Sequence, residues 1–192
     1  MFPGRRRGLR GGRCDHGSSG RRCPVSAVKV VLVLGDDVST DVIYPGRYMA
    51  TVLPTETPQY AFADHAQFNT LLKSGGVAEG SVVVGGKNFG CGSSREQAVS
   101  TLKGHELVIV AEGFARIFLQ NAINLGLRLV EAPGVRAGPG DELAIGSVEV
   151  VNLTSGKRFA TRPLPAARQA IIDAGGLIPY TRKRLLEKTG AR

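Results

Sequence analysis

A glycine-rich stretch carries two serines and an arginine at the point where a buried strand is expected to give way to a helix. It covers residues 85–96 and reads Gly-Gly-Lys-Asn-Phe-Gly-Cys-Gly-Ser-Ser-Arg-Glu. The apolar residues 82–84 before it predict a short buried strand, and residues 97–103 after it predict a helix. Backbone N–H groups and the helix dipole attract anions at a helix N-terminus. A hydroxyl and a guanidinium placed there are suited to binding a carboxylate and to moving a proton beside it.

Two residues, Ser94 and Gln97, are expected to set the start of that helix. Ser94 is a candidate N-cap, and Gln97 stands three residues later, as in a capping box. The helix is expected to end at Gly104. From these residues alone, the simpler structural interpretation is that Ser94 only caps the helix, Arg95 is a surface residue and the aspartates of residues 36–41 are turn residues.

The remaining sequence predicts strands and helices that alternate in the middle of the chain and hairpins later on. Residues 35–53 read as a loop, residues 58–72 as partly helical around 60–68, and residues 113–125 as a helix that Gly126 closes. Strands are expected over 28–34, 81–84, 107–111, 127–130 and 158–161, a hairpin over 142–153, and terminal helices over 165–174 and 179–187. This pattern predicts an α/β fold with a mixed sheet flanked by helices.

Composition favours one globular domain over residues 25–192. The chain has 192 residues, of which 42% are hydrophobic and 21% charged. No apolar run approaches the roughly 18 residues that a membrane span needs. Three cysteines, without a C-x-x-C pair, indicate a reduced intracellular protein, which we expect in the cytoplasm.

Residues 1–24 form an Arg/Gly-rich extension that is expected to be disordered. Seven arginines and one aspartate in residues 1–22 supply +6 of the net charge of +9, so the rest carries only +3. An inert extension, an upstream start codon and a weak transit peptide all remain open for this segment. Its arginines are the one feature that favours nucleic-acid binding, but they lack interleaved aromatic residues. The spacing of Cys14, His16 and Cys23 does not favour a metal site.

Four segments, in the same order, resemble the small subunits of 3-isopropylmalate dehydratase, the detached swivel domain of the aconitase superfamily. The resemblance runs over about residues 28–186 and is far more specific than one glycine-rich loop. It implies a swivelling β/β/α domain. The segments are the glycine-rich stretch 88–96, the loop Gly-Asp-Asp-Val-Ser-Thr-Asp-Val-Ile-Tyr-Pro-Gly-Arg-Tyr at 35–48, the helix Phe-Ala-Arg-Ile-Phe with its following asparagines at 114–126, and the closing turn Ala-Gly-Gly-Leu-Ile at 174–178.

The resemblance implies a hydro-lyase subunit of leucine biosynthesis. The family's reaction moves a hydroxyl between adjacent carbons of a malate by removing water and adding it back. A [4Fe–4S] cluster, held by three cysteines of a separate large subunit, supplies the Lewis acid. Because this chain has too few suitably spaced cysteines to hold a cluster, we expect it to bind none and to be inactive without that partner.

The resemblance also implies roles for four residues. Ser93 corresponds to the family's base, and a serine acts as a base only where dipoles and cations stabilise its alkoxide. Arg95 is suited to clamping a substrate carboxylate, and Ser94 to donating a hydrogen bond to substrate. Asp41 matches an acidic position near the family's site and is expected to orient Ser93 or an arginine. Cys91 is expected to be neighbouring structure only.

Residues 47–51 are the candidate substrate-selecting loop. In related homoaconitase-type subunits an arginine able to bind a distal carboxylate follows the tyrosine by two residues, and Ala50 stands there in this chain. An apolar lining favours 2-isopropylmalate, because an extra carboxylate would be left unpaired. Arg47 keeps the alternatives open, which are the small subunits of homoaconitase, methylcitrate or dimethylmalate dehydratase. The candidate substrate-binding residues are Arg47, Tyr48, Met49, Ala50 and Thr51.

Overall fold

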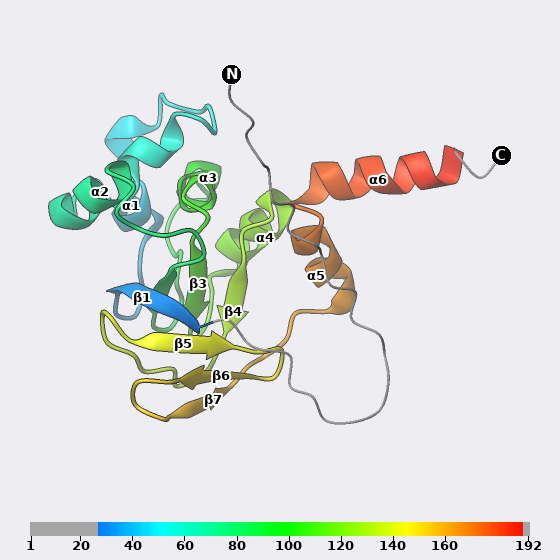
Figure 1. The fold of residues 1–192 in the computed structure, drawn as a ribbon. Helices are drawn as coiled ribbons and strands as arrows, with labels where there is room; N and C mark the ends of the chain where they lie inside the picture. Colours follow the sequence, from blue (N-terminus) through cyan, green and yellow to red (C-terminus); the bar gives the residue numbers. More distant parts are fainter. Residues whose placement is uncertain (1–26, 190–192) are drawn as a thin grey trace, which may run out of the picture.

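A seven-stranded mixed sheet organises the residues that this computed structural model describes, which are 27–189 (Figure 1). The strands lie in the order β4-β3-β2-β1-β5-β6-β7. The first four pair in parallel, and the β1–β5, β5–β6 and β6–β7 pairs are antiparallel. Their bounds are β1 Ala27–Val33, β2 Val82–Gly85, β3 Val108–Ala111, β4 Leu129–Glu131, β5 Glu142–Ile145, β6 Glu149–Asn152 and β7 Arg158–Ala160. The mixed α/β fold predicted from the sequence is confirmed.

The central strands β2 and β3 are buried along their whole length, as their unbroken apolar runs predict. Successive side chains of a strand point to opposite faces. Val83 therefore packs with Leu102 in a core beneath the helices, whereas Val82 and Val84 pack with Leu143 in a second core on the other face.

The segment that follows β7 returns to β4, the strand at the opposite edge of the sheet. The backbone N–H of Arg162, just after β7, donates to the carbonyl of Glu131 in β4 at 2.8 Å. The two side chains add an ion pair, with 2.9 Å between Nη1 and Oε1. The second core lies between the parallel and antiparallel halves that this contact brings together.

Helices cover the outer face of the parallel half, where α3 and α4 lie side by side (Figure 1). Their apolar faces fill the first core with alternate residues of the strands. The helices are α1 Thr40–Ile43, α2 Ala66–Lys73, α3 Glu96–Gly104, α4 Arg116–Leu125, α5 Ala166–Asp173 and α6 Leu177–Thr189, with 3-10 turns η1 Gly46–Tyr48 and η2 Thr57–Tyr60.

Two predicted elements near the N-terminal end were wrong. The predicted loop over 35–53 contains α1 and η1, because Ser39 caps α1 through a 3.1 Å bond from the Asp41 N–H. The helix predicted around 60–68 begins only at Ala66. Phe62 adopts a left-handed φ of 50° and donates its N–H to the Ile43 carbonyl, which no helix accommodates.

Gly126 ends α4 as predicted, with a left-handed φ of 71°. A Cβ atom there would lie 2.4 Å from the carbonyl carbon of Gly175. Gly176 is as constrained, because its Cβ would lie 2.6 Å from the Asn124 carbonyl oxygen. The glycines of the closing turn therefore let the α5–α6 connection pass directly against the end of α4.

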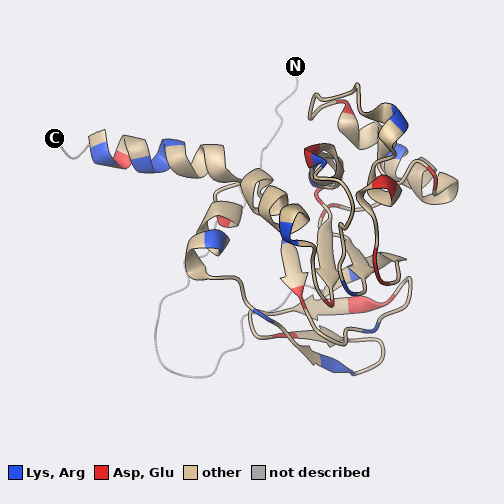
Figure 2. Ribbon diagram, turned by 180° about the vertical axis from the view of Figure 1, so that it is seen from behind, with Lys and Arg blue, Asp and Glu red and all other residues tan. Residues whose placement is uncertain are grey.

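Helix α6 extends away from the sheet (Figure 1), and Figure 2 shows its charges, mostly basic. Within residues 27–189, no helix combines the length and the apolar character that crossing a membrane demands. The predicted extension over residues 1–24, with Cys14, His16 and Cys23, lies outside the described residues.

Replacing Gly126 tests the close passage, with Gly134 as a matched control. Both have a left-handed φ, of 71° and 72°, but a Cβ at Gly134 meets no described atom within 4 Å. We expect Gly134→Ala to lower the free energy of unfolding by about 1–2 kcal/mol, the cost of a left-handed alanine. Gly126→Ala adds the clash and is expected to cost about 2–5 kcal/mol, measured by urea unfolding. Equal losses would show that the passage is not tight.

Candidate active site

Two loops that follow adjacent parallel strands are joined by backbone hydrogen bonds. The loop after β1 ends in α1, and the loop after β2, residues 86–95, lies within the glycine-rich stretch 85–96. The Gly90 N–H donates to the Val38 carbonyl and the Thr40 N–H to the Cys91 carbonyl, both at 2.8 Å. Because the carboxyl ends of parallel strands lie at one edge of a sheet, residues about 50 positions apart meet here.

Two glycines allow this pairing. Gly90 has a φ of 81°, and a Cβ there would lie 2.1 Å from Cγ of Phe118 in α4. Gly92 has a φ of 91° and faces the Ser39 hydroxyl, which a Cβ would meet at 3.1 Å. Larger residues would push the loop away from both α4 and α1.

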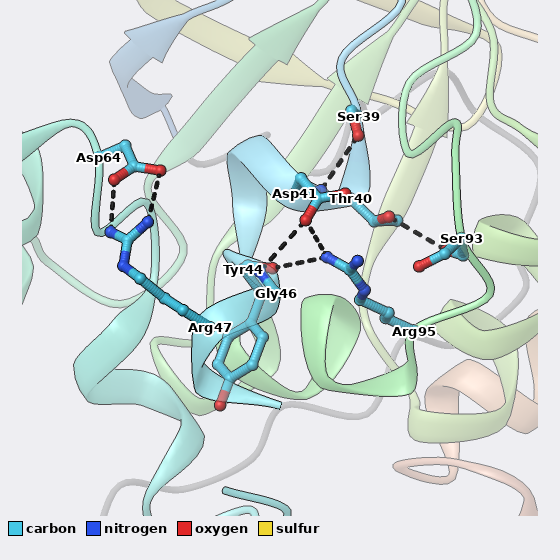
Figure 3. Close-up of polar contacts among 9 residues, drawn as sticks. All are labelled: Ser39, Thr40, Asp41, Tyr44, Gly46, Arg47, Asp64, Ser93 and Arg95. Carbon is cyan, nitrogen blue, oxygen red and sulfur yellow. Dashed lines mark hydrogen bonds and ion pairs between the residues drawn. The ribbon is translucent and has the colours of Figure 1, made fainter. Parts of the chain in front are cut away.

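Ser93 is exposed at the end of this paired segment. Its carbonyl accepts a 3.1 Å hydrogen bond from Oγ1 of Thr40, a side chain that is 1% exposed (Figure 3). The backbone at Ser93 is therefore fixed to α1, while its own hydroxyl side lies open to solvent.

Arg95 turns toward α1 and forms an ion pair with Asp41 (Figure 3). Asp41 also accepts the Gly46 N–H at 3.2 Å, and Arg95 donates to the Tyr44 carbonyl at 3.4 Å. The hydrogen bond from Arg95 holds the pKa of the Asp41 carboxyl below its ordinary value, against the opposing effect of its partial burial. Asp41 therefore stays charged near neutral pH and contacts the arginine, while its predicted role in orienting a site residue stays a prediction.

The guanidinium of Arg95 is largely enclosed, with only 15% of its side chain exposed. Its contacts to Asp41 and Tyr44 both run through Nη1. Within the described part of the chain, the buried Nε has no acceptor. An unpaired buried donor costs free energy, so this side chain favours binding of a further anionic group, to which Nε would donate.

The predicted N-cap role of Ser94 was wrong. Helix α3 begins at Glu96, its N-cap is Arg95, and no side chain caps it. The Arg95 N–H donates to the Ser93 carbonyl at 2.8 Å, and this tight turn delays the start of the helix by one residue. Ser94 is exposed in the turn, beside Ser93.

The candidate substrate-selecting loop lies next to this centre. A Cβ at Gly46 would come within 3.2 Å of both Nη2 of Arg95 and Oδ1 of Asp41, so the loop touches the pair through bare backbone. Tyr48 stacks on Tyr60 with 4.1 Å between ring centroids. Thr51 is half buried, whereas Met49 and Ala50 are exposed.

Arg47 points away from Arg95 (Figure 3). Its guanidinium makes two bonds to Asp64, at 2.5 and 3.2 Å. The structure therefore groups Ser93, Arg95 and Asp41 but turns the side chain of Arg47 elsewhere.

Within residues 27–189, no three His, Cys, Asp or Glu side chains gather closely enough to hold a metal ion. Cys91 is half buried, and its thiol donates to the Asp37 carbonyl at 3.2 Å. A single thiol in this setting does not fit the three cysteines that a [4Fe–4S] cluster takes in the family.

Known proteins resemble both the sequence and the fold. Residues 63–133 match the family described as the Aconitase C-terminal domain. The chain is 43% identical over 156 residues to the 3-isopropylmalate dehydratase small subunit of Moorella thermoacetica, an alignment that covers 79% of this chain and 92% of that one. This chain belongs to the family of 3-isopropylmalate dehydratase small subunits.

Two proteins of Methanocaldococcus jannaschii support the assignment. The isopropylmalate/citramalate isomerase small subunit is 42% identical over 159 residues, 80% of this chain and 92% of that one. A crystal structure described as 3-isopropylmalate dehydratase (LeuD) superposes with a TM-score of 0.77 at 37% identity, covering 85% of this chain and 98% of that one. The resemblance stated from the sequence is confirmed, and the relatives' designation as small subunits implies a large-subunit partner.

Sequence reasoning missed three residues whose contacts support or border the site. Thr40 was part of a recognised motif, but its hydroxyl contact to the Ser93 carbonyl had no signal in the spacing. Asp64 belongs to no motif, although an acidic residue near Arg47 was a general possibility. The buried Tyr44, whose hydroxyl supports residues 48–51, read only as part of a loop.

Paired substitutions at Thr40 test whether its hydroxyl positions Ser93. Thr40→Val removes the hydroxyl and is expected to cost about 1 kcal/mol of unfolding free energy. Thr40→Ser keeps the hydroxyl and loses a buried methyl, which costs about as much. With similar stabilities, we expect only Thr40→Val to lower turnover with the large subunit, by about ten- to a hundredfold. Equal turnover in the two variants would contradict a positioning role.

Proposed function

We propose that this chain, together with an iron–sulfur large subunit, isomerises 2-isopropylmalate to 3-isopropylmalate. Water is removed across two adjacent carbons to give an alkene and is then added back the other way round. The observation that carries the proposal is the meeting of Ser93, Arg95 and Asp41 where two loops join at the ends of β1 and β2. In this arrangement a hydroxyl lies open beside an oriented, largely enclosed guanidinium, which suits an anionic hydroxy acid.

Ser93 is the proposed base. It takes the proton from carbon as the hydroxyl leaves and returns a proton in the rehydration step. A serine hydroxyl does this only if its alkoxide is stabilised. Arg95 two residues away and the N-terminus of α3 supply positive potential at this corner, and the Thr40 bond fixes the backbone from which the hydroxyl extends.

Arg95 is the proposed carboxylate clamp. Asp41 holds Nη1, which leaves the other side of the guanidinium for a substrate carboxylate. Enclosure strengthens such a contact, because less water screens it. Ser94, exposed beside Ser93, is a further candidate donor to the substrate.

The departing hydroxide needs a Lewis acid, which the family supplies as one iron of a [4Fe–4S] cluster in the large subunit. This chain's own residues bind, orient and move the proton. We therefore expect no turnover from the isolated chain.

The substrate-selecting loop favours an apolar substituent. Met49 and Ala50 present small or apolar side chains, and Ala50 stands where related subunits carry a carboxylate-binding arginine. A buried carboxylate without a partner would be costly, so isopropyl is preferred. Citramalate is the second candidate, because one relative is named an isopropylmalate/citramalate isomerase subunit and a methyl group is apolar like isopropyl.

Reconstitution with a cluster-containing large subunit from the same genome tests the function and the base together. Absorbance of the unsaturated intermediate should rise from isopropylmalate only when both subunits are present. Ser93→Ala is expected to bind the large subunit normally and to lower kcat by about two to four orders of magnitude. Ser74→Ala, which removes an exposed hydroxyl at the end of α2, serves as control. Near-normal turnover by Ser93→Ala would end the assignment of the base.

A substitution at Ala50 tests the selecting loop. Ala50→Arg adds a guanidinium able to pair with a distal carboxylate. We expect it to shift the kcat/KM ratio toward substrates that carry one, by about tenfold or more. Ala50→Met adds similar length without charge and should leave that preference unchanged. An equal change of the kcat/KM ratio in both variants would show that the size of residue 50, and not its charge, determines the preference.

A further inference from the structure

Arg47 directly follows a glycine that contacts the candidate active site. Its neighbour Gly46 contacts both Arg95 and Asp41 through backbone alone. The Arg47 side chain nevertheless leaves this centre and ends on Asp64 (Figure 3). A second guanidinium thus begins next to the site but does not face it.

Asp64 and an aromatic ring together define where that guanidinium lies. Nη2 and Nη1 of Arg47 bond separately to the two oxygens of Asp64, at 2.5 and 3.2 Å. The guanidinium carbon also lies 4.8 Å from the centroid of the Tyr48 ring, which itself stacks on Tyr60. A two-pronged ion pair over a fixed ring orients the side chain as well as neutralising it.

The backbone of the loop is held by a different residue. The hydroxyl of the fully buried Tyr44 lies 2.9 Å from the Tyr48 carbonyl and 3.2 Å from that of Thr51. Burial raises the pKa of Tyr44 above its ordinary value, so this hydroxyl stays a donor. Loss of Asp64 therefore frees the Arg47 side chain without releasing residues 48–51.

The ion pair is exposed, with 52% of the Arg47 side chain and 61% of the Asp64 side chain accessible. Such pairs restrain a side chain by only about two- to fivefold in population. A restraint of that size biases the choice among substrates without excluding any of them. A substrate carboxylate that reaches Arg47 has to displace Asp64 first.

We propose that Asp64 is a specificity-determining residue, which keeps Arg47 out of the substrate site and so disfavours malates with an anionic substituent. This inference rests on the proposed function. Asp64 does not touch the reacting atoms and acts only through Arg47. The apolar surface of Met49 and Ala50 then remains the part of the loop that meets the substituent.

Substrate preference in the reconstituted complex provides the first test. The kcat/KM values are measured for 3-isopropylmalate and for a malate that carries a carboxymethyl group instead of isopropyl. Asp64→Asn is expected to raise the ratio of carboxymethyl to isopropyl substrate by about two- to fivefold, while isopropylmalate turnover stays nearly constant. Asp64→Glu should keep the wild-type ratio, because it preserves the charge.

Two further variants isolate the cause. Glu149→Gln neutralises one partner of another exposed ion pair, with Arg158 in the antiparallel half, and should leave the ratio unchanged. Arg47→Gln combined with Asp64→Asn should return the ratio to the wild-type value. An unchanged ratio in Asp64→Asn, or an altered one that survives loss of Arg47, overturns the proposal.

Limited trypsin digestion tests the restraint without using activity. Cleavage after Arg47 requires its side chain to enter the protease, and the Asp64 pair competes with that. We expect the fragment beginning at Tyr48 to form about two to five times faster in Asp64→Asn than in the wild type or Glu149→Gln. Unchanged cleavage overturns the inference, whereas an inactive wild-type complex with faster cleavage in the variant would overturn the proposed function alone.

Discussion

The backbone pairing between the loops that follow β1 and β2 is the contact on which the rest of the site depends. The bonds from Gly90 to Val38 and from Thr40 to Cys91 bring α1 against the glycine-rich stretch. Glycines at 90 and 92 permit it, since any Cβ at 90 would collide with Phe118. Parallel pairing of β1 and β2 brings only the first residues of the two loops together. The hydrogen bonds between the loops also bring Ser93, Arg95 and Asp41 close to one another.

The same pairing explains how the chain accommodates a largely enclosed arginine. Enclosing a guanidinium is costly unless a countercharge accompanies it, and Asp41 arrives on α1 because the loops are joined. Asp41 bonds to Nη1 of the guanidinium and is itself half exposed. Nε of Arg95 is left without an acceptor in residues 27–189, which favours binding of a further anionic group.

Much of this fold follows from local patterns, and the part that does not follow is non-local. Unbroken apolar runs predicted β2 and β3, and Gly126 predicted the end of α4. Burial and a left-handed φ restrict which residue types can occupy the positions themselves, so both leave a signal in the local sequence. The start of α2 was misplaced, since the strained turn at Phe62 is held by the carbonyl of Ile43, which is distant in sequence. Ser94 failed as a cap because the Arg95 N–H bonds to the Ser93 carbonyl and α3 begins one residue later. The ion pair of Arg95 with Asp41, 54 positions away, has no local signal. The resemblance nominated Ser93, Arg95 and Asp41, and the structure adds that they are neighbours, while their roles stay predictions.

Arg47 and Arg95, which follow β1 and β2 respectively, differ in how far their side chains are buried. Each has a carboxylate partner, and the hydrogen bond from Arg47 also holds the pKa of Asp64 below its ordinary value. The two pairs differ in the arginine, because 15% of the Arg95 side chain is exposed against 52% of the Arg47 side chain, so water competes less for Arg95. At the exposed pair water competes with both partners, so Asp64 sets only a population for Arg47. In the proposed function, Arg95 is therefore a firmly held partner for the carboxylate that all malates share, and Arg47 is a weakly held group beside the variable substituent.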